Sequence, residues 1–475
     1  MTEATPDPTG PTPYDDATLA AVDRWVDYRL WHTRTPGAQV AIGLHGRPLF
    51  SRAYGYADLE RRTPMRTDHL FRIASHSKTF TATLVLQLVD EGWVGLEDPV
   101  GRFVPELEGP VADVRVRELL EHTSGILRDS RDAGFWQHDR PFPERDELLA
   151  LARDGGLKTD PGLRFAYSNI GYSLLGLVVE NVIGTSFAEA AASRVLTPLG
   201  LADTAADYLH ERAEDYAAGY TGLATEARRR PLGHVDTGAM AAATGFTSTA
   251  TDLLTYFGAH AFGDERLLPD RTKRLQQRRV NVTDPTGSGG SDAEGYGWGM
   301  VSETVDDTSY VGHAGGYPGH ITKTMLDPAT GLVVCVLTNA IDGPATALAR
   351  GIVALLAEAR RGQEQGRTPS ATTLARTGRY GDDWSVVDVA ALGGRLRTLG
   401  LGGWTPLEGA DELTEDGPDQ LLIAAGNGYG SVGEPVTFRT GDGGEVVEMR
   451  YGGMALRPRP ELAEPEDYRA GWPSA

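Results

Sequence analysis

Ser75 and Lys78 stand three residues apart at the start of a strongly apolar segment, residues 75–91. Residues three apart on a helix share one face, so a hydroxyl and an amine would lie side by side, one turn apart. Burial disfavours the charged form of an amine, and a neutral lysine can take the proton of a serine that attacks a carbonyl. The chain has only 4 lysines against 41 arginines, so a chance match of a serine and a lysine at this spacing is rare. The same spacing also fits a helix-capping serine beside a solvated lysine.

Two further groups of residues could face the same site. Tyr167 and Asn169 lie two apart in a loop that opens a predicted helix, where a phenol can relay a proton and an amide can hold a substrate carbonyl. The run Gly312-His313-Ala314-Gly315-Gly316 ends a predicted strand in glycines, which let another backbone come close. It could carry a backbone N–H for an oxyanion and a histidine that faces the ligand. Taken one at a time, a structural role explains each group better.

Together, in this order and spacing, the three groups resemble the serine β-lactamase and penicillin-binding protein superfamily. The chain is most similar to the class C-like branch that holds D-stereospecific aminopeptidases, alkaline D-peptidases and carboxylesterases. The resemblance covers about 17–360, and it includes the phrases LLEHTSGI (119–126) and DPATGLVVCVLTN (327–339). It implies catalysis through an acyl-enzyme.

The resemblance also implies a role for each residue of the site, and no cofactor or metal. Ser75 would be the acylated nucleophile, Lys78 its proton partner, Tyr167 the general base or acid, Asn169 the group that orients the substrate amide, His313 a wall of the site, and the N–H groups of Ser75 and Gly316 the oxyanion hole.

One position departs from the pattern of the β-lactamases. These enzymes and the cell-wall transpeptidases usually carry Lys-Thr-Gly where this chain has His313-Ala314-Gly315. The lysine helps to bind the carboxylate of a β-lactam or of a peptide C-terminus, so its absence predicts poor β-lactam hydrolysis. Arg450, in a predicted strand that ends in Gly452 and Gly453, could hold a substrate carboxylate instead. A solvated surface arginine is the simpler interpretation of that residue.

Three functions stay open at this point. The first is a serine hydrolase that acts on amides, on peptides with a D-residue, or on esters. The second keeps the acylation but releases and cyclises nonribosomal peptides from an acyl carrier, as a stand-alone thioesterase. The third is a binding protein that retains the fold without catalysis, and the intact motifs weigh against it.

The elements that must position these residues follow from the hydrophobic patterns. Strand-like runs at 38–44, at 48–55 and within 308–340 bracket a middle with helical periodicity, for which 186–196 and 252–262 are the clearest segments. The economical arrangement is an α+β fold, in which one antiparallel sheet is built from both ends and helices pack on it.

Four parts are expected along the chain: a disordered N-terminus at 1–16, the hydrolase domain at 17–360, a polar linker at 361–373 and a small β-barrel domain at 374–465. Short strand-like runs between Gly, Pro and Asp predict the last part. It resembles the lipocalin-like domain appended to some of these peptidases. Such a domain would shape substrate choice.

Composition excludes several classes of protein. A net charge of −21 over 475 residues argues against binding to a nucleic-acid backbone or to anionic lipid. The sequence has no run of about 18 apolar residues, so no membrane span is predicted. The first residues lack the pattern of a secretory signal. Cys335 is the only cysteine, which excludes internal disulfides. We therefore expect a cytoplasmic protein whose partner is a small-molecule or peptide substrate, and the oligomeric state stays open.

Overall fold

The computed structural model describes residues 14–224, 227–283, 294–366, 368–417, 420–426, 431–459 and 462. These residues divide into two compact units. The first unit covers the described residues of 35–346, and the second covers 14–34 and those that follow 346. The units are taken one at a time below, and the predicted limits of the domains stay predictions.

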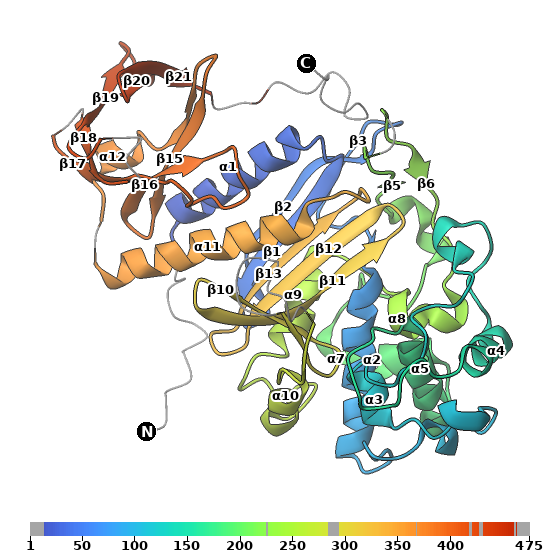
Figure 1. Cartoon of the computed structure of the whole chain (residues 1–475). Helices are drawn as coiled ribbons and strands as arrows, with labels where there is room; N and C mark the ends of the chain where they lie inside the picture. Colours follow the sequence, from blue (N-terminus) through green and yellow to red (C-terminus); the bar gives the residue numbers. More distant parts are fainter. Residues whose placement is uncertain are drawn as a thin grey trace, which may run out of the picture. The chain divides into compact units, whose positions relative to one another are not determined.

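The first unit contains one antiparallel sheet, in which strands from its two ends lie side by side (Figure 1). Among the described residues its nine strands follow the spatial order β3 (Thr63–Pro64), β2 (Arg47–Asp58), β1 (Gly37–Leu44), β13 (Leu332–Thr338), β12 (His320–Asp327), β11 (Thr308–Tyr317), β10 (Val301–Val305), β9 (Gly295–Tyr296) and β8 (Asn281–Val282). The join is the pairing of β1 with β13, where Ala41 lies opposite Cys335. The prediction of one sheet built from both ends is confirmed.

Local chemistry explains why this sheet forms. β1 and β2 are joined by His45 and Gly46, both at positive φ, which is the backbone that a two-residue hairpin requires. β13 is a continuous run of Leu, Val, Cys and Thr that is buried along its whole length, as expected of a central strand.

The first unit also contains helices. Their bounds are α2 (Ser77–Asp90), α3 (Val116–Leu120), α4 (Arg145–Gly155), α5 (Asn169–Ile183), α6 (Phe187–Ala191), α7 (Thr197–Leu199), α8 (Ala241–Thr244), α9 (Ala250–Gly258) and α10 (Asp270–Gln276). α9 packs on β1, β2 and β13, while α2, α5 and α8 pack on one another. Apolar side chains of α2 and α5 belong to the main core, so the predicted α+β fold is confirmed.

Two short pairs of strands complete the first unit. β5 (Gly219–Tyr220) pairs with β6 (Pro231–Leu232), and β4 (Phe71–Arg72) pairs with β7 (Thr247–Ser248). β4 directly precedes the segment that carries Ser75, and Ile73 N donates a hydrogen bond to Phe246 O at 2.9 Å. The backbone that leads to Ser75 is therefore held along its length by residues 246–248.

The second unit contains a closed β-barrel, so the predicted barrel is confirmed. In the part of the chain that is described, eight strands close it in sequence order: β14 (Gly378–Gly381), β15 (Val386–Leu392), β16 (Arg395–Gly400), β17 (Glu412–Glu415), β18 (Gln420–Ala425), β19 (Pro435–Thr440), β20 (Val446–Tyr451) and β21 (Met454–Pro458). Its core is a separate apolar cluster that includes Tyr380, Ile423, Phe438 and Met449.

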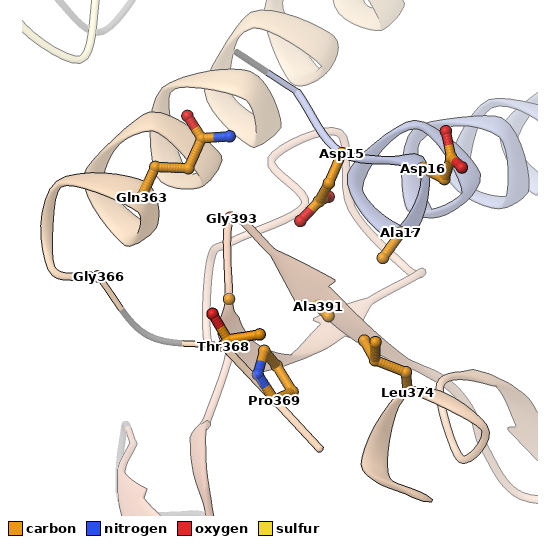
Figure 2. A pocket seen from close by; sticks show the side chains of 11 residues that line it. Asp15, Asp16, Ala17, Gln363, Gly366, Thr368, Pro369, Leu374, Ala391 and Gly393 are labelled. Atoms are coloured by element: carbon orange, nitrogen blue, oxygen red, sulfur yellow. The ribbon is translucent and has the colours of Figure 1, made fainter. Parts of the chain in front are cut away.

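Helices α1 (Asp16–His32) and α12 (Ala371–Leu374) and nearly all of α11 (Ala345–Glu364) belong to this second unit. α1 packs against β15, and a Cβ at Gly351 would lie 2.1 Å from the Trp25 ring, so α1 and α11 approach closely. A cavity of 470 Å³ lies beside the start of α1 and the turn at Gly393, and two aspartates, Asp15 and Asp16, are on its wall (Figure 2). It contains none of the candidate site residues.

Helices extend into two of the predicted segments. The polar linker at 361–373 is partly helical, because α11 continues to Glu364 and α12 begins at Ala371. Gln and Glu are good helix formers, so the polar residues extend the helix that the apolar ones begin. Of the N-terminus predicted to be disordered, 1–13 lie outside the described residues, and Asp16 already belongs to α1, which Asp15 caps.

Over the described residues, no single helix is long and apolar enough to cross a membrane. One bent pair of helices, Asn169–Ile183 with Phe187–Leu199, has the length and composition of a membrane span, and it meets no other criterion for one.

Candidate active site

Ser75 lies in a 3₁₀ turn, Ala74–His76, that precedes helix α2, and not in the first turn of an α-helix as the periodicity predicted. Ala74 has φ +46°, a left-handed conformation that is uncommon for a residue with a side chain. Ser77 holds this turn, because its hydroxyl donates to Ala74 O at 2.5 Å and accepts from Phe246 N at 3.0 Å. Ser75 itself stays half-buried, while both of its neighbours are buried.

Lys78 is fully buried, and its amine reaches Ser75 as the spacing predicted. The Nζ atom lies 3.3 Å from Ser75 Oγ, 2.7 Å from Asn169 Oδ1 and 2.7 Å from Ala243 O. Burial lowers the pKa of the Lys78 amine well below its ordinary value of 10.5, although the carboxylate of Asp129 acts in the opposite direction. The site therefore favours the neutral amine.

The three neighbours of Nζ decide where the lone pair of a neutral amine points. An amide oxygen and a backbone carbonyl can only accept hydrogen bonds. Asn169 Oδ1 and Ala243 O therefore take the two N–H bonds of the amine. The lone pair is left for the third neighbour, the hydroxyl of Ser75, so this arrangement can remove the proton of that hydroxyl.

Tyr167 meets the same hydroxyl from another segment of the chain. Its phenol donates to Ser75 Oγ at 2.9 Å, and the Lys78 amine lies 4.8 Å from the centre of its ring. Burial raises the pKa of the Tyr167 phenol, and the hydrogen bond with Ser75 partly offsets this rise. A neutral phenol can donate a proton to a leaving group and recover it from the next acceptor.

His122 holds the backbone on both sides of Tyr167. Ala166 N donates to His122 O at 2.7 Å, and Ser168 N donates to His122 Nδ1 at 3.0 Å. The two rings lie 4.2 Å apart, and His122 has φ +56°. We did not assign this histidine to the site from the sequence, although it lies in the phrase LLEHTSGI. The position of His122 in that phrase was the sequence signal that could have placed it at the site.

Asn169 and Asp129 complete the inner group. Asn169 begins helix α5, whose N-cap is Ser168, and it is 2% exposed. Its amide donates from Nδ2 to Asp129 Oδ1 at 2.7 Å, opposite the bond from Lys78. Asp129 could not be predicted as a site residue from the sequence, because a single aspartate after a glycine turn belongs to no recognisable motif.

Strand β11 carries the glycine-rich motif to the same place. Its partner β10 pairs only as far as Gly312, so within the described residues no strand adjoins Ala314–Tyr317 on that side. β11 and β12 are joined by a two-residue turn between Tyr317 and His320. Because hydrogen-bond directions alternate along an antiparallel strand, the N–H of Gly316 points away from β12, toward the open edge. Gly316 is exposed, so this N–H is available to a ligand.

His313 lies beneath the surface of the site. It is 4% exposed, with Tyr296 Oη 3.2 Å from Nε2 and Ala314 O 2.6 Å from Nδ1. Burial lowers the pKa of the His313 imidazole well below its ordinary value, and His76 and Lys78 add to this effect. This shift favours the neutral ring, and a direct contact of His313 with substrate stays a prediction.

Arg450 lies on β20 in the second unit, with its side chain 60% exposed and its Nε 3.2 Å from Glu448 Oε1. A role of Arg450 in holding a substrate carboxylate stays a prediction. In the described part of the chain, no group of three or more His, Cys, Asp or Glu side chains could hold a metal ion.

Gly315 is where β11 approaches the segment before Ser75. A Cβ at Gly315 would lie 2.2 Å from Ile73 O, whereas a Cβ at Gly316 would meet nothing closer than Ile321 Cδ1 at 3.6 Å. We expect Gly315→Ala to displace the strand from Ser75, at a cost of about 1–3 kcal/mol for overpacking, and to slow acylation. Thermal unfolding and labelling by an acylating probe measure the two effects.

The matched control is Gly316→Ala, which should unfold at the wild-type temperature. A Gly315→Ala variant with wild-type Tm and labelling rate would show that the close approach does not position the site.

Comparison with known proteins assigns the chain to a family. A family model described as Beta-lactamase matches residues 22–359, so the chain belongs to the Beta-lactamase family. Esterase EstB from Burkholderia gladioli is 32% identical over 409 residues, covering 74% of this chain and 99% of that protein. The predicted superfamily and its esterase and amidase branch are confirmed.

Two solved structures share the fold. The octameric penicillin-binding protein homologue from Pyrococcus abyssi aligns with a TM-score of 0.63 and 24% identity, over 92% of this chain and 99% of that one. The D-amino acid amidase from Ochrobactrum anthropi SV3 aligns with a TM-score of 0.57 and 27% identity, over 68% of this chain and 91% of that one. The chain is thus a β-lactamase-fold hydrolase related to an esterase and to D-amino acid amidases.

Proposed function

We propose that this protein is a serine hydrolase that forms an acyl-enzyme on Ser75 with amide, peptide or ester substrates. The observation that carries the proposal is the position of Ser75 Oγ, 3.3 Å from a buried lysine amine and 2.9 Å from a tyrosine phenol. A serine needs a group that takes its proton before it can attack a carbonyl, and both candidates are in place.

Acylation begins when the neutral amine of Lys78 takes the proton of Ser75 and Oγ attacks the substrate carbonyl. The N–H groups of Ser75 and Gly316 then donate to the oxyanion of the tetrahedral intermediate. The open edge of β11 and its close approach at Gly315 support this pairing of donors.

Release of the first product requires a proton on the leaving group. Tyr167 donates it from the phenol that bonds to Ser75, and the proton on Lys78 returns to the phenol. Deacylation reverses these transfers, with Tyr167 and Lys78 removing a proton from the incoming water. Asn169 is proposed to orient the substrate amide beside its bond to Lys78.

We propose that the acyl donor is an amide or peptide with a D-residue, or a small ester. The relatives support these classes, since one is named an esterase and another a D-amino acid amidase. Hydrolysis needs no cofactor here. The net charge of −21 argues against nucleic-acid and anionic-membrane partners. We propose a cytoplasmic protein that acts on small-molecule or peptide substrates.

A panel of acyl donors tests the proposal. We expect nitrophenyl esters and D-amino acid amides to be hydrolysed and nitrocefin to be a poor substrate, because the neutral, buried His313 stands where a lysine would hold the β-lactam carboxylate. Initial rates on D- and L-phenylalanine amide, a nitrophenyl ester and nitrocefin give the comparison.

Turnover of nitrocefin equal to that of the best ester or amide would contradict this proposal. A peptidyl thioester mimic belongs to the same panel: conversion to a ring, with no free acid, would assign the protein to the thioesterase and cyclase alternative.

A further inference from the structure

Asp129 contacts the site from a loop outside the three motifs. Its Oδ1 accepts from Asn169 Nδ2 at 2.7 Å and from Trp136 Nε1 at 3.0 Å, and its Oδ2 lies 3.3 Å from Arg128 Nε. The side chain is only 11% exposed. We propose that Asp129 is a positioning residue that holds the Asn169 amide in one orientation, and thereby directs the lone pair of Lys78 at Ser75. This inference rests on the proposed function and deepens it.

The argument depends on what an ionised carboxylate can do in a hydrogen bond. It only accepts, so the amide of Asn169 must turn its NH₂ group toward Asp129. The amide oxygen then faces Lys78, as the 2.7 Å distance from Nζ to Oδ1 shows. Trp136 and Arg128 hold the carboxylate from two other directions, which leaves it little freedom to turn.

The opposite orientation of the amide would disable the base. If Asn169 were turned by 180°, its NH₂ group would donate to the lone pair of the neutral Lys78 amine. Ser75 would then lose the acceptor for its proton, although every residue of the three motifs would still be present. The carboxylate of Asp129 excludes this arrangement, because it would leave two acceptors, Asp129 and the amide oxygen, facing each other.

The charge of Asp129 has a second, measurable effect. Asp129 raises and Arg128 lowers the pKa of Lys78, so removal of the carboxylate leaves only the lowering charge. Burial keeps the other ionisable groups around the amine neutral, through raised or lowered pKa values: Tyr167, Tyr172, His122 and His313. The pKa of Lys78 should therefore fall further when Asp129 becomes neutral.

The test is the variant Asp129→Asn, assayed with a nitrophenyl ester across a range of pH. We expect kcat to fall by about a hundredfold with KM nearly unchanged, because a turned amide withdraws the general base, whose complete loss costs about 10²–10⁴-fold. The acid limb of the kcat/KM profile should shift to lower pH, since Lys78 then stays neutral in more acidic solution. A purely structural role for Asp129 would not move this limb.

A double-mutant cycle isolates the route of the effect. If Asp129 acts through the amide, Asp129→Asn should change kcat no further in an Asn169→Ala background. The matched control is Asp132→Asn on the same loop, a side chain that is 78% exposed, and it should keep wild-type kcat. If Asp129→Asn does not fold, Trp136→Phe removes one donor to the carboxylate, and it should lower kcat in the same direction by a smaller factor.

Wild-type kcat and an unshifted pH profile for Asp129→Asn would overturn the inference. A further hundredfold fall in kcat when Asp129→Asn is added to Asn169→Ala would also overturn it. Either result leaves the proposed function standing if Ser75→Ala is inactive. An active Ser75→Ala variant would overturn the proposed function itself.

Discussion

Ser75→Ala is expected to lose about six orders of magnitude in turnover, the cost typical of a removed serine nucleophile. The reason is geometric: Ser75 carries the hydroxyl that both the Lys78 amine and the Tyr167 phenol reach. A fluorophosphonate probe followed by peptide mapping should place the added mass on Ser75 in the wild type and on no peptide of the variant. Steady-state kinetics on a nitrophenyl ester measure the loss of turnover.

An exposed serine on the helical part of the same unit, Ser193, provides the control. Ser193→Ala should be labelled and should turn over substrate at the wild-type rate. Near wild-type activity of Ser75→Ala on any true substrate would show that the covalent scheme is wrong.

Lys78→Arg is expected to be nearly inactive, although it keeps a basic group on a side chain of similar length. A guanidinium does not give up its proton in a protein, so it has no lone pair for the hydroxyl of Ser75. The buried site also favours a neutral group, as the lowered pKa of Lys78 indicates. The rate of labelling of Ser75 by an acylating probe measures the effect on acylation directly.

Lys158→Arg is the matched control, because Lys158 is exposed and belongs to none of the three motifs. It should react at the wild-type rate. Activity above about a tenth of wild type in Lys78→Arg would contradict a role as general base, since loss of general-base catalysis costs 10²–10⁴-fold.

The elements of the fold were predictable where local pattern and turn chemistry agree. The runs at 38–44 and 48–55 became β1 and β2, and the turn between them needed only His45 and Gly46 at positive φ. The barrel strands were predictable as short runs between Gly, Pro and Asp. Closure of the barrel was not, because closure depends on β14 pairing with β21 across the whole domain.

The site was predictable only as far as the motifs reach. Ser75 and Lys78 are neighbours on one turn, so their contact follows from local geometry. The 3₁₀ turn at Ser75 was not foreseen, because Phe246 and β7 hold it from a distant part of the chain. Arg450 lies in the second unit, where its side chain contacts Glu448 on its own strand, and its role in holding a carboxylate stays a prediction.

The sequence by itself determined which residues are proposed to carry the chemistry, because residue type and short spacing depend on the local chain alone. Tertiary structure decided the burial of Lys78 and the groups that surround its amine. Burial, which lowers the pKa of the amine, comes from packing over the whole unit, and the two acceptors of its protons, Asn169 and Ala243, lie far away in the chain. A serine beside a lysine is common in sequence, but a serine facing the lone pair of a neutral lysine requires a folded, dry interior.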